Sequence, residues 1–285
     1  MNDSIDFRRV AGRLENEYVR EWKARGGRVA GFFCAHAPEE LLWAAGILPV
    51  RVRGTGSEDT SLADQYLGSV NCGFVRHTLN RVLSGELGFL DALLLTNSCD
   101  HLRRLSDIST AKQVAPFCHY IDVPHLNSET ARSRLTEQLR QLRERLESVF
   151  ALSISDEQVA DAVKLYNQTR RLLSRASQLR SAEPPRATGS EVLAMAVAAV
   201  SMPKDRFNAL LEQRLEQLEA REHAPAGGPR LLIVGGALDD PAYVEIIESL
   251  GARVVADQLC WGAKTFSEEA EEGGDPIEAI ARRIL

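Results

Sequence analysis

The residues with the clearest chemical potential lie between Asp91 and Arg104, where an apolar run stops at a cysteine and an aspartate. The run up to Thr96 predicts a strand, and Asp100 is expected to open a helix. This places the Cys99 thiol at the carboxyl end of a strand and at a helix N-terminus. Open α/β sheets bind ligands at this edge, and a helix N-terminus favours a thiolate. Cys99 is therefore a candidate metal ligand or nucleophile; the alternative is a small buried hydrophobe, the commonest role of a free cysteine.

The other four cysteines are widely spaced and form no CxxC motif. This spacing excludes a disulfide framework, a zinc ribbon and a bacterial ferredoxin run. Cys72 lies at the expected start of a helix, Cys260 follows a strand, and Cys34 lies at a strand end two residues before His36. Cys118 falls within an expected strand and is assigned to the core. Three thiols at such edges could meet over one crevice, where they would suit an iron–sulfur cluster or zinc.

Three titratable side chains flank the candidate ligands: Arg76, His77 and His101. Each is a weak catalytic candidate, because imidazole and guanidinium groups can move protons or stabilise developing negative charge. A surface or hydrogen-bonded structural role is the alternative for each of them.

Apolar spacing predicts alternating helices and strands in the first part of the chain. Phe7, Val10 and Leu14 recur at three- and four-residue steps, which predicts one amphipathic helix over residues 7–25. Strands linked by helices form a parallel sheet covered on both faces. The expected strands are 28–35, 49–53, 89–96 and 117–123, and the expected helices between them are 38–46, 72–83 and 100–113.

The pattern changes twice after residue 127. Only helices are expected from 128 to 222, and the linker-like segment 224–229 precedes a second α/β unit. That unit has a strand at 230–236, a helix at 243–250 and a strand at 252–256. We therefore predict a first α/β domain over 1–127, a helical segment over 128–223 and a second α/β domain over 224–285. Two strands make a poor independent sheet, so the second domain is expected to be incomplete or finished by a partner.

Composition narrows the function classes. The net charge of −6, from 34 basic and 40 acidic residues, argues against wholesale nucleic-acid binding. No apolar run approaches the roughly 20 residues of a membrane span, and the first six residues do not resemble a signal peptide. We expect a cytoplasmic protein. The Gly235–Gly236 pair is not a GxGxxG motif, and it favours a tight turn over dinucleotide binding.

Five motifs in order resemble one family, that of the 2-hydroxyacyl-CoA dehydratases and benzoyl-CoA reductases. The resemblance covers nearly the whole chain, and the arginine pair after Ser-Cys-Asp favours the reductase branch. The motifs are Pro-Glu-Glu-Leu-Leu-Trp-Ala-Ala-Gly-Ile-Leu-Pro at 38–49, Cys-Gly-Phe-Val-Arg at 72–76, Leu-Thr-Asn-Ser-Cys-Asp at 95–100, Tyr-Ile-Asp-Val-Pro at 120–124 and Val-Ala-Asp-Gln-Leu-Cys-Trp-Gly at 255–262, followed by Asp-Pro-Ile at 275–277.

The resemblance implies a fold and a cofactor. Such subunits have flavodoxin-like α/β domains around a helical segment and bind a [4Fe-4S] cluster through three cysteines. Cys72 and Cys99 match the first two ligand positions. Cys260 matches a family cysteine and is taken as the third ligand, although the family's third ligand commonly lies further toward the C-terminus, in a segment that this chain lacks.

The implied function is that of an iron–sulfur subunit in anaerobic metabolism, which passes single low-potential electrons to a CoA thioester and forms a ketyl radical. Dehydration or ring reduction follows. The implied partners are an acyl-CoA substrate, a related second subunit in a heterodimer or homodimer, and a separate ATP-dependent iron–sulfur activator. Two alternatives stay open: a non-catalytic partner subunit of the same fold, and an unrelated zinc- or dinucleotide-binding α/β protein.

Overall fold

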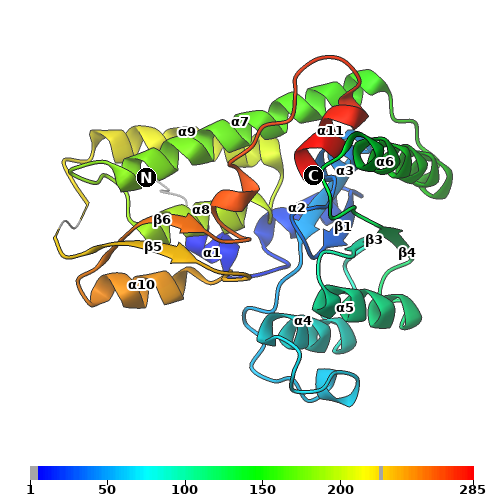
Figure 1. Ribbon diagram of the computed structural model, residues 1–285, viewed down its shortest axis with the longest axis horizontal. Helices are drawn as coiled ribbons and strands as arrows, with labels where there is room; N and C mark the ends of the chain where they lie inside the picture. Colours follow the sequence, from blue (N-terminus) through cyan, green and yellow to red (C-terminus); the bar gives the residue numbers. More distant parts are fainter. Residues whose placement is uncertain (1–5, 225–226) are drawn as a thin grey trace. The chain divides into compact units, whose positions relative to one another are not determined.

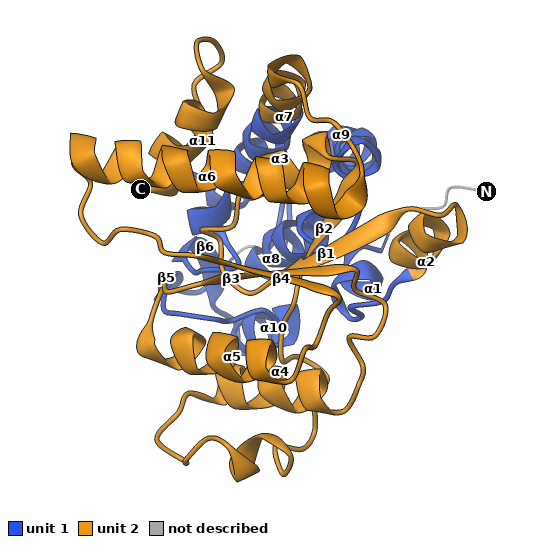
Figure 2. Ribbon diagram, turned by 90° about the vertical axis from the view of Figure 1, so that its right-hand side faces the viewer, with its two compact units in different colours: residues 1–16, 165–269 blue, residues 17–164, 270–285 orange. Residues whose placement is uncertain are grey.

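A computed structural model describes residues 6–224 and 227–285 of the chain. Residues 1–5 of the N-terminal segment and 225–226 of the predicted linker lie outside the described residues. The chain forms two compact units (Figure 2). Unit 1 comprises residues 1–16 and 165–269, and unit 2 comprises residues 17–164 and 270–285. Each unit is thus assembled from two separate stretches of the chain.

Unit 2 is built on a parallel sheet with the strand order β2-β1-β3-β4. Every strand has five residues, and β3 is buried along its whole length. β1 pairs with β2 from Arg28↔Ile47 to Phe32↔Arg51. The predicted parallel α/β fold is therefore confirmed. The strands are β1 (Arg28–Phe32), β2 (Ile47–Arg51), β3 (Ala92–Thr96) and β4 (Phe117–Ile121).

Helices cover both faces of this sheet, as predicted. Figure 2 shows α4 (Gly73–Leu83) and α5 (Asp100–Ala111) on one face, and α6 (Glu129–Phe150) and α11 (Pro276–Ile284) on the other. Leu135, Leu139, Leu142 and Leu146 bury one stripe of α6, which packs against α11. The remaining elements of unit 2 are α2 (Glu17–Ala24), α3 (Glu39–Ala44), the 3-10 turn η1 (Ala63–Gln65) and the start of α7.

Unit 1 is mostly helical, with a small parallel sheet of β5 (Arg230–Val234) and β6 (Arg253–Gln258). Its centre is α8 (Gly189–Ala199), which is apolar on every side and buried at nearly every residue. α8 packs against α1 (Phe7–Ala11), α9 (Lys204–Ala220), α10 (Pro241–Ser249) and β6. The long helix α7 (Asp156–Ser181) passes from unit 2 into unit 1 at Leu165, and the 3-10 turn η2 (Ala263–Thr265) follows β6.

The single helix predicted over residues 7–25 is wrong. The chain forms the short helix α1 and then α2, with a break at residues 12–16. The reason is a long-range contact. Asn16 is fully buried, and its Nδ2 donates to the Ser201 carbonyl at 2.7 Å. A contact between residues so distant in sequence leaves no trace in local apolar spacing.

The boundaries of the compact units differ from those of the predicted stretches 1–127, 128–223 and 224–285. The predicted boundaries were placed where the type of element changes along the chain. Packing instead groups the first sixteen residues with the second sheet, and α11 with the first. Among the described residues, no helix combines the length and the apolar character needed to cross a lipid bilayer.

Candidate functional site

The carboxyl edge of the unit 2 sheet is shaped by the polar residues that follow β3. Thr96 Oγ1 lies 2.9 Å from Ser98 Oγ, within hydrogen-bonding distance. The buried Asn97 accepts from the Val123 amide at 2.8 Å and donates to the Val123 carbonyl at 3.1 Å. The Asn97 bonds connect the end of β3 to the residues that follow β4. Cys99, which comes directly after Ser98, is exposed at the surface.

Cys99 and Cys72 occupy equivalent positions on neighbouring helices. Cys99 is the N-cap of α5, Cys72 is the N-cap of α4, and both thiols are exposed. The two helices pack against each other, as Figure 1 shows. Asn71 Oδ1 and His101 Nδ1 lie 3.1 Å apart, so the residue before one cysteine contacts a residue just after the other. The structure therefore brings the surroundings of both predicted ligands together at one edge of the sheet.

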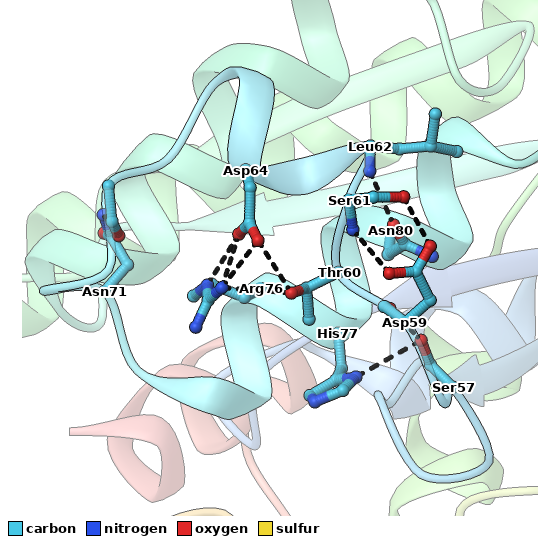
Figure 3. A network of polar contacts seen from close by, with 11 residues as sticks. Ser57, Asp59, Thr60, Ser61, Leu62, Asp64, Asn71, Arg76, His77 and Asn80 are labelled. Atoms are coloured by element: carbon cyan, nitrogen blue, oxygen red, sulfur yellow. Dashed lines mark hydrogen bonds and ion pairs between the residues drawn. The ribbon is translucent and has the colours of Figure 1, made fainter.

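Arg76 and His77 point toward the segment that precedes α4 (Figure 3). Arg76 donates to both carboxylate oxygens of Asp64, at 2.8 and 2.7 Å, and to Thr60 at 3.0 Å. His77 Nδ1 lies 3.3 Å from Ser57 Oγ. The hydrogen bond from Arg76 outweighs the opposing effect of desolvation and lowers the pKa of Asp64. These contacts fasten the segment from Ser57 to Asp64 onto α4, whereas His101 reaches the neighbourhood of Cys72.

Gly54 is what allows this segment to lie so close to the helix. A Cβ on Gly54 would lie 2.8 Å from the Cβ of His77 and 3.2 Å from the Phe74 carbonyl. The first of these distances is shorter than real Cβ contacts and the second is tight, so a larger residue at position 54 would require the segment or α4 to shift. The absence of a side chain at residue 54 thus favours the close approach that places Ser57 beside His77.

A further thiol, which the sequence did not single out as a ligand, lies at the same sheet edge. Cys34 follows β1, and its Sγ lies 3.7 Å from His36 Nδ1, which in turn lies 3.2 Å from Ser98 Oγ. Burial opposes ionisation of this thiol, but the hydrogen bond and charge of His36, with the charge of Arg51, outweigh it and lower the pKa of Cys34 to about 6. The cysteine–histidine spacing at a strand end was visible in the sequence, whereas the contact with Ser98 depends on the pairing of β1 with β3.

Cys260 lies in unit 1, on the loop that follows β6. Asp257 shapes this loop, because its Oδ1 accepts from the amides of Leu259 at 3.1 Å and Ala263 at 2.8 Å. Its Oδ2 forms a buried ion pair with Arg180 at 2.7 Å. The spacing of Asp257 and Cys260 in the motif thus has a structural reason. The Asp257 side chain stabilises the loop on which Cys260 lies.

Two glycines complete the surroundings of Cys260. The carbonyl of Gly236, in the turn after β5, accepts from the Cys260 amide at 3.2 Å. A Cβ on Gly262 would collide with the Asp257 carboxylate. Cys260 is therefore held half-buried beside the carboxyl ends of both strands of the small sheet. The chain bends at Gly236, just after β5.

The donor set of unit 2 fits part of an iron–sulfur site. Thiolates are the ligands that such clusters require, and Cys72 and Cys99 present two exposed thiols at neighbouring helix N-termini. Among residues 6–224 and 227–285, no three His, Cys, Asp or Glu side chains are grouped so as to hold a metal ion. The geometry within unit 2 thus supplies two candidate ligands, and the predicted third, Cys260, belongs to unit 1.

Comparison with known proteins identifies a family pattern and several relatives. Residues 34–285 match the pattern of the family described as 2-hydroxyglutaryl-CoA dehydratase, D-component. A subunit of the benzoyl-CoA reductase of Thauera aromatica is 26% identical over 278 residues, which cover 95% of this chain and 72% of that protein.

Two dehydratase subunits are similarly related. The (R)-phenyllactyl-CoA dehydratase beta subunit of Clostridium sporogenes is 25% identical, over 98% of this chain and 75% of that protein. The beta subunit of the (R)-2-hydroxyglutaryl-CoA dehydratase of Acidaminococcus fermentans is 25% identical, over 92% of this chain and 70% of that protein.

Proposed function

The chain belongs to the 2-hydroxyglutaryl-CoA dehydratase D-component family, and we propose that it is an iron–sulfur subunit of an acyl-CoA dehydratase or a benzoyl-CoA reductase. Its relatives are named as subunits of enzymes whose substrates are CoA thioesters. The observation that carries the proposal is the pairing of the two helix N-termini, where the Asn71–His101 contact brings the surroundings of Cys72 and Cys99 together.

Cys72 and Cys99 would hold a [4Fe-4S] cluster, with Cys260 as the proposed third ligand. When bound, such a cluster would supply single low-potential electrons to the carbonyl of a CoA thioester. Cys72 and Cys99 are the N-caps of α4 and α5 and form no side-chain cap hydrogen bond, and the unsatisfied N–H groups of a helix N-terminus stabilise the negative charge of thiolate ligands.

His101 is the catalytic candidate that the geometry favours over Arg76 and His77. If the neutral ring donates from Nδ1 to Asn71 Oδ1, its Nε2 is an acceptor and can take up a proton. In the protonated form, Nε2 becomes a donor that can stabilise negative charge on a nearby carbonyl oxygen. Arg76 is instead engaged by Asp64, and His77 lies beside Ser57.

The proposed partners follow from the same family membership. The chain would act with a related subunit, receive electrons from a separate ATP-dependent iron–sulfur activator and bind the acyl-CoA. A non-catalytic role in the same assembly is the competing proposal, and it is favoured by the grouping of only two candidate ligands within the described part of unit 2.

Anaerobic iron and sulfide analysis, combined with electron paramagnetic resonance, tests this proposal. Wild-type protein is expected to bind about four iron atoms per chain, the content of one cubane. Cys99→Ala should lose most of the iron and the paramagnetic signal. Cys118→Ala is the matched control, because Cys118 lies within β4 and its Sγ contacts the Ala115 carbonyl; it should retain both.

Two results would contradict the cluster. One is a protein that binds zinc in place of iron and sulfide. The other is iron content that is equal in wild type and Cys99→Ala. A wild type without iron that still assembles with a related subunit would support the non-catalytic role.

A further inference from the structure

The orientation of the Asn71 side chain is decided by a backbone carbonyl. The Asn71 backbone amide donates to the Gly68 carbonyl at 3.0 Å, and the side-chain Nδ2 donates to the same oxygen at 3.0 Å. A carbonyl oxygen only accepts hydrogen bonds, so the nitrogen of the side-chain amide has to face Gly68. The Oδ1 atom is then left for His101, whose Nδ1 lies 3.1 Å away.

This orientation determines which ring nitrogen of His101 carries the hydrogen. An amide oxygen is an acceptor only, so the hydrogen bond to Asn71 Oδ1 requires a hydrogen on Nδ1 of His101. A neutral imidazole has one N–H group, and its other nitrogen, Nε2, therefore carries the free lone pair. The bonds from Gly68 through Asn71 to His101 thus select one of the two tautomers of the ring.

The opposite arrangement is disfavoured. If the Asn71 amide were turned over, its Oδ1 would face the Gly68 carbonyl oxygen, and two acceptors cannot form a hydrogen bond with each other. The Asn71 Nδ2 group would then donate to Nδ1 of His101, and the ring hydrogen would lie on Nε2. Because that state loses the side-chain bond to Gly68, the tautomer with the hydrogen on Nδ1 has the lower free energy.

The turn that holds Asn71 is itself fastened to α4. Arg76 binds the Asp64 carboxylate and Thr60, as Figure 3 shows. Asp64 and Arg76 lie on either side of Asn71 in the sequence, so their ion pair closes a loop that contains Asn71 and Cys72. A closed loop has fewer conformations than an open one. The pair of Asp64 and Arg76 therefore limits the movement of Asn71.

We propose that Asn71 is a positioning residue that holds His101 with its hydrogen on Nδ1, so that Nε2 is the hydrogen-bond acceptor of the ring. This role rests on the proposed function, in which His101 meets the acyl-CoA beside Cys72 and Cys99. Histidines that act through one ring nitrogen are commonly oriented by an oxygen that accepts from the other nitrogen. Asn71 supplies that oxygen from the residue before the N-cap of α4.

Heteronuclear magnetic resonance of the imidazole nitrogens tests this role. The sample is the full chain without bound metal, under alkaline conditions in which histidine rings are neutral, and His101→Gln identifies the His101 signals. In the wild type, Nδ1 should have the chemical shift of a protonated nitrogen and Nε2 that of an unprotonated one. Asn71→Leu removes the accepting oxygen, so both shifts should move toward the intermediate values of a tautomer mixture.

Two further variants make the measurement specific. Asn71→Asp keeps an oxygen acceptor beside Nδ1 of His101, so it should restore the wild-type pattern, and it guards against a folding defect in Asn71→Leu. Asn127→Leu is the matched control, because the Asn127 side-chain oxygen accepts from Arg132 Nε at 2.9 Å instead of from a histidine. It should leave the His101 signals unchanged.

Three results would overturn the role of Asn71. They are a wild-type His101 with its hydrogen on Nε2, a His101 pattern that is the same in Asn71→Leu, and a change in Asn127→Leu as large as that in Asn71→Leu. Because the sample contains no metal, the outcome is separate from that of the iron analysis. A chain that binds no iron but keeps the hydrogen on Nδ1 would contradict the proposed cluster and still support the role of Asn71.

Discussion

At the scale of single residues, the thiol of Cys34 is expected to be reactive at neutral pH. The pKa of about 6 results from His36 and Arg51, whose effects exceed the opposing effect of burial. Iodoacetamide labelling of the Cys34 peptide, followed by mass spectrometry, should therefore rise with a midpoint near pH 6. His36→Ala removes the hydrogen bond and the charge, so labelling at pH 7 should fall about tenfold or more, since each pKa unit changes the thiolate fraction tenfold.

Cys118 provides the internal control for this experiment. Burial raises the pKa of its thiol, so its peptide should be labelled little at pH 7 in both proteins. A wild-type midpoint near that of a free cysteine, about 8.5, would show that His36 does not stabilise the Cys34 thiolate.

The residues of the candidate site were only partly predictable from the sequence. The position of Cys99 at a helix N-cap followed from an apolar run that ends before an aspartate, because strand and helix signals are local. The bonds that surround it are not local, since Ser98 meets His36 across 62 residues and Asn97 meets Val123 across 26. Those contacts depend on the strand order β1-β3-β4, which apolar spacing does not encode.

At the scale of elements, one ion pair connects α3 with α11. Arg283 Nε lies 3.3 Å from Glu40 Oε1, and the Glu40 side chain is fully buried. Arg283→Ala removes this partner from a buried carboxylate, which is expected to lower the free energy of unfolding by about 3–5 kcal/mol. Arg282→Ala is the matched control, because Arg282 pairs with Glu278 at the surface and such pairs contribute about 1 kcal/mol or less.

Urea unfolding monitored by circular dichroism would measure both variants. Equal losses for Arg283→Ala and Arg282→Ala would mean that the buried pair does not anchor α11. The comparison is informative because the two arginines are consecutive in one helix and differ mainly in the exposure of their partners.

Elements were predicted well where their patterns were long, and poorly where a distant contact intervened. The apolar stripe of α6 and the small residues of α8 predicted both helices from local spacing. The break between α1 and α2 was missed because it depends on buried Asn16, whose partner Ser201 is 185 residues away in the sequence. Periodicity thus identifies elements, whereas their interruptions are decided by tertiary contacts.

At the scale of the whole molecule, the two sheets of the described residues differ in size, with four strands in unit 2 and two strands in unit 1. The sequence predicted two strands between residues 230 and 256, and the described residues there form a two-stranded parallel sheet. The assignment of elements to compact units could not be predicted in the same way. α11 follows the second sheet in sequence but packs on α6 in unit 2, and an amphipathic face does not specify which partner will cover it.

The protein is also expected to lose stability on acidification, and His119 accounts for the first part of this loss. Burial, with the charge of Arg145, lowers the pKa of His119 to about 4 from its ordinary value of 6.5. Between these values the unfolded chain binds the proton and the folded chain does not, so stability falls as the pH falls from 6.5 to 4. Below pH 4 both states are protonated, and the contribution of His119 to the slope ends.

Urea unfolding of wild type and His119→Asn at a series of pH values would isolate this contribution. One pKa unit corresponds to about 1.4 kcal/mol, so after allowance for partial exposure the stability difference between the two proteins should change by about 1–3 kcal/mol from about pH 7 to about pH 4.

Glu191 and Asp275 serve as the reference. Burial raises the pKa of each, but hydrogen bonds, chiefly from Arg221 to Glu191 and from the Glu278 amide to Asp275, outweigh it and lower both pKa values. The stabilisation that these two carboxylates contribute is lost as they become protonated at lower pH, and it is expected to be the same in wild type and His119→Asn. Any difference between the pH profiles of the two proteins therefore reports on His119. Parallel profiles would contradict the role of His119.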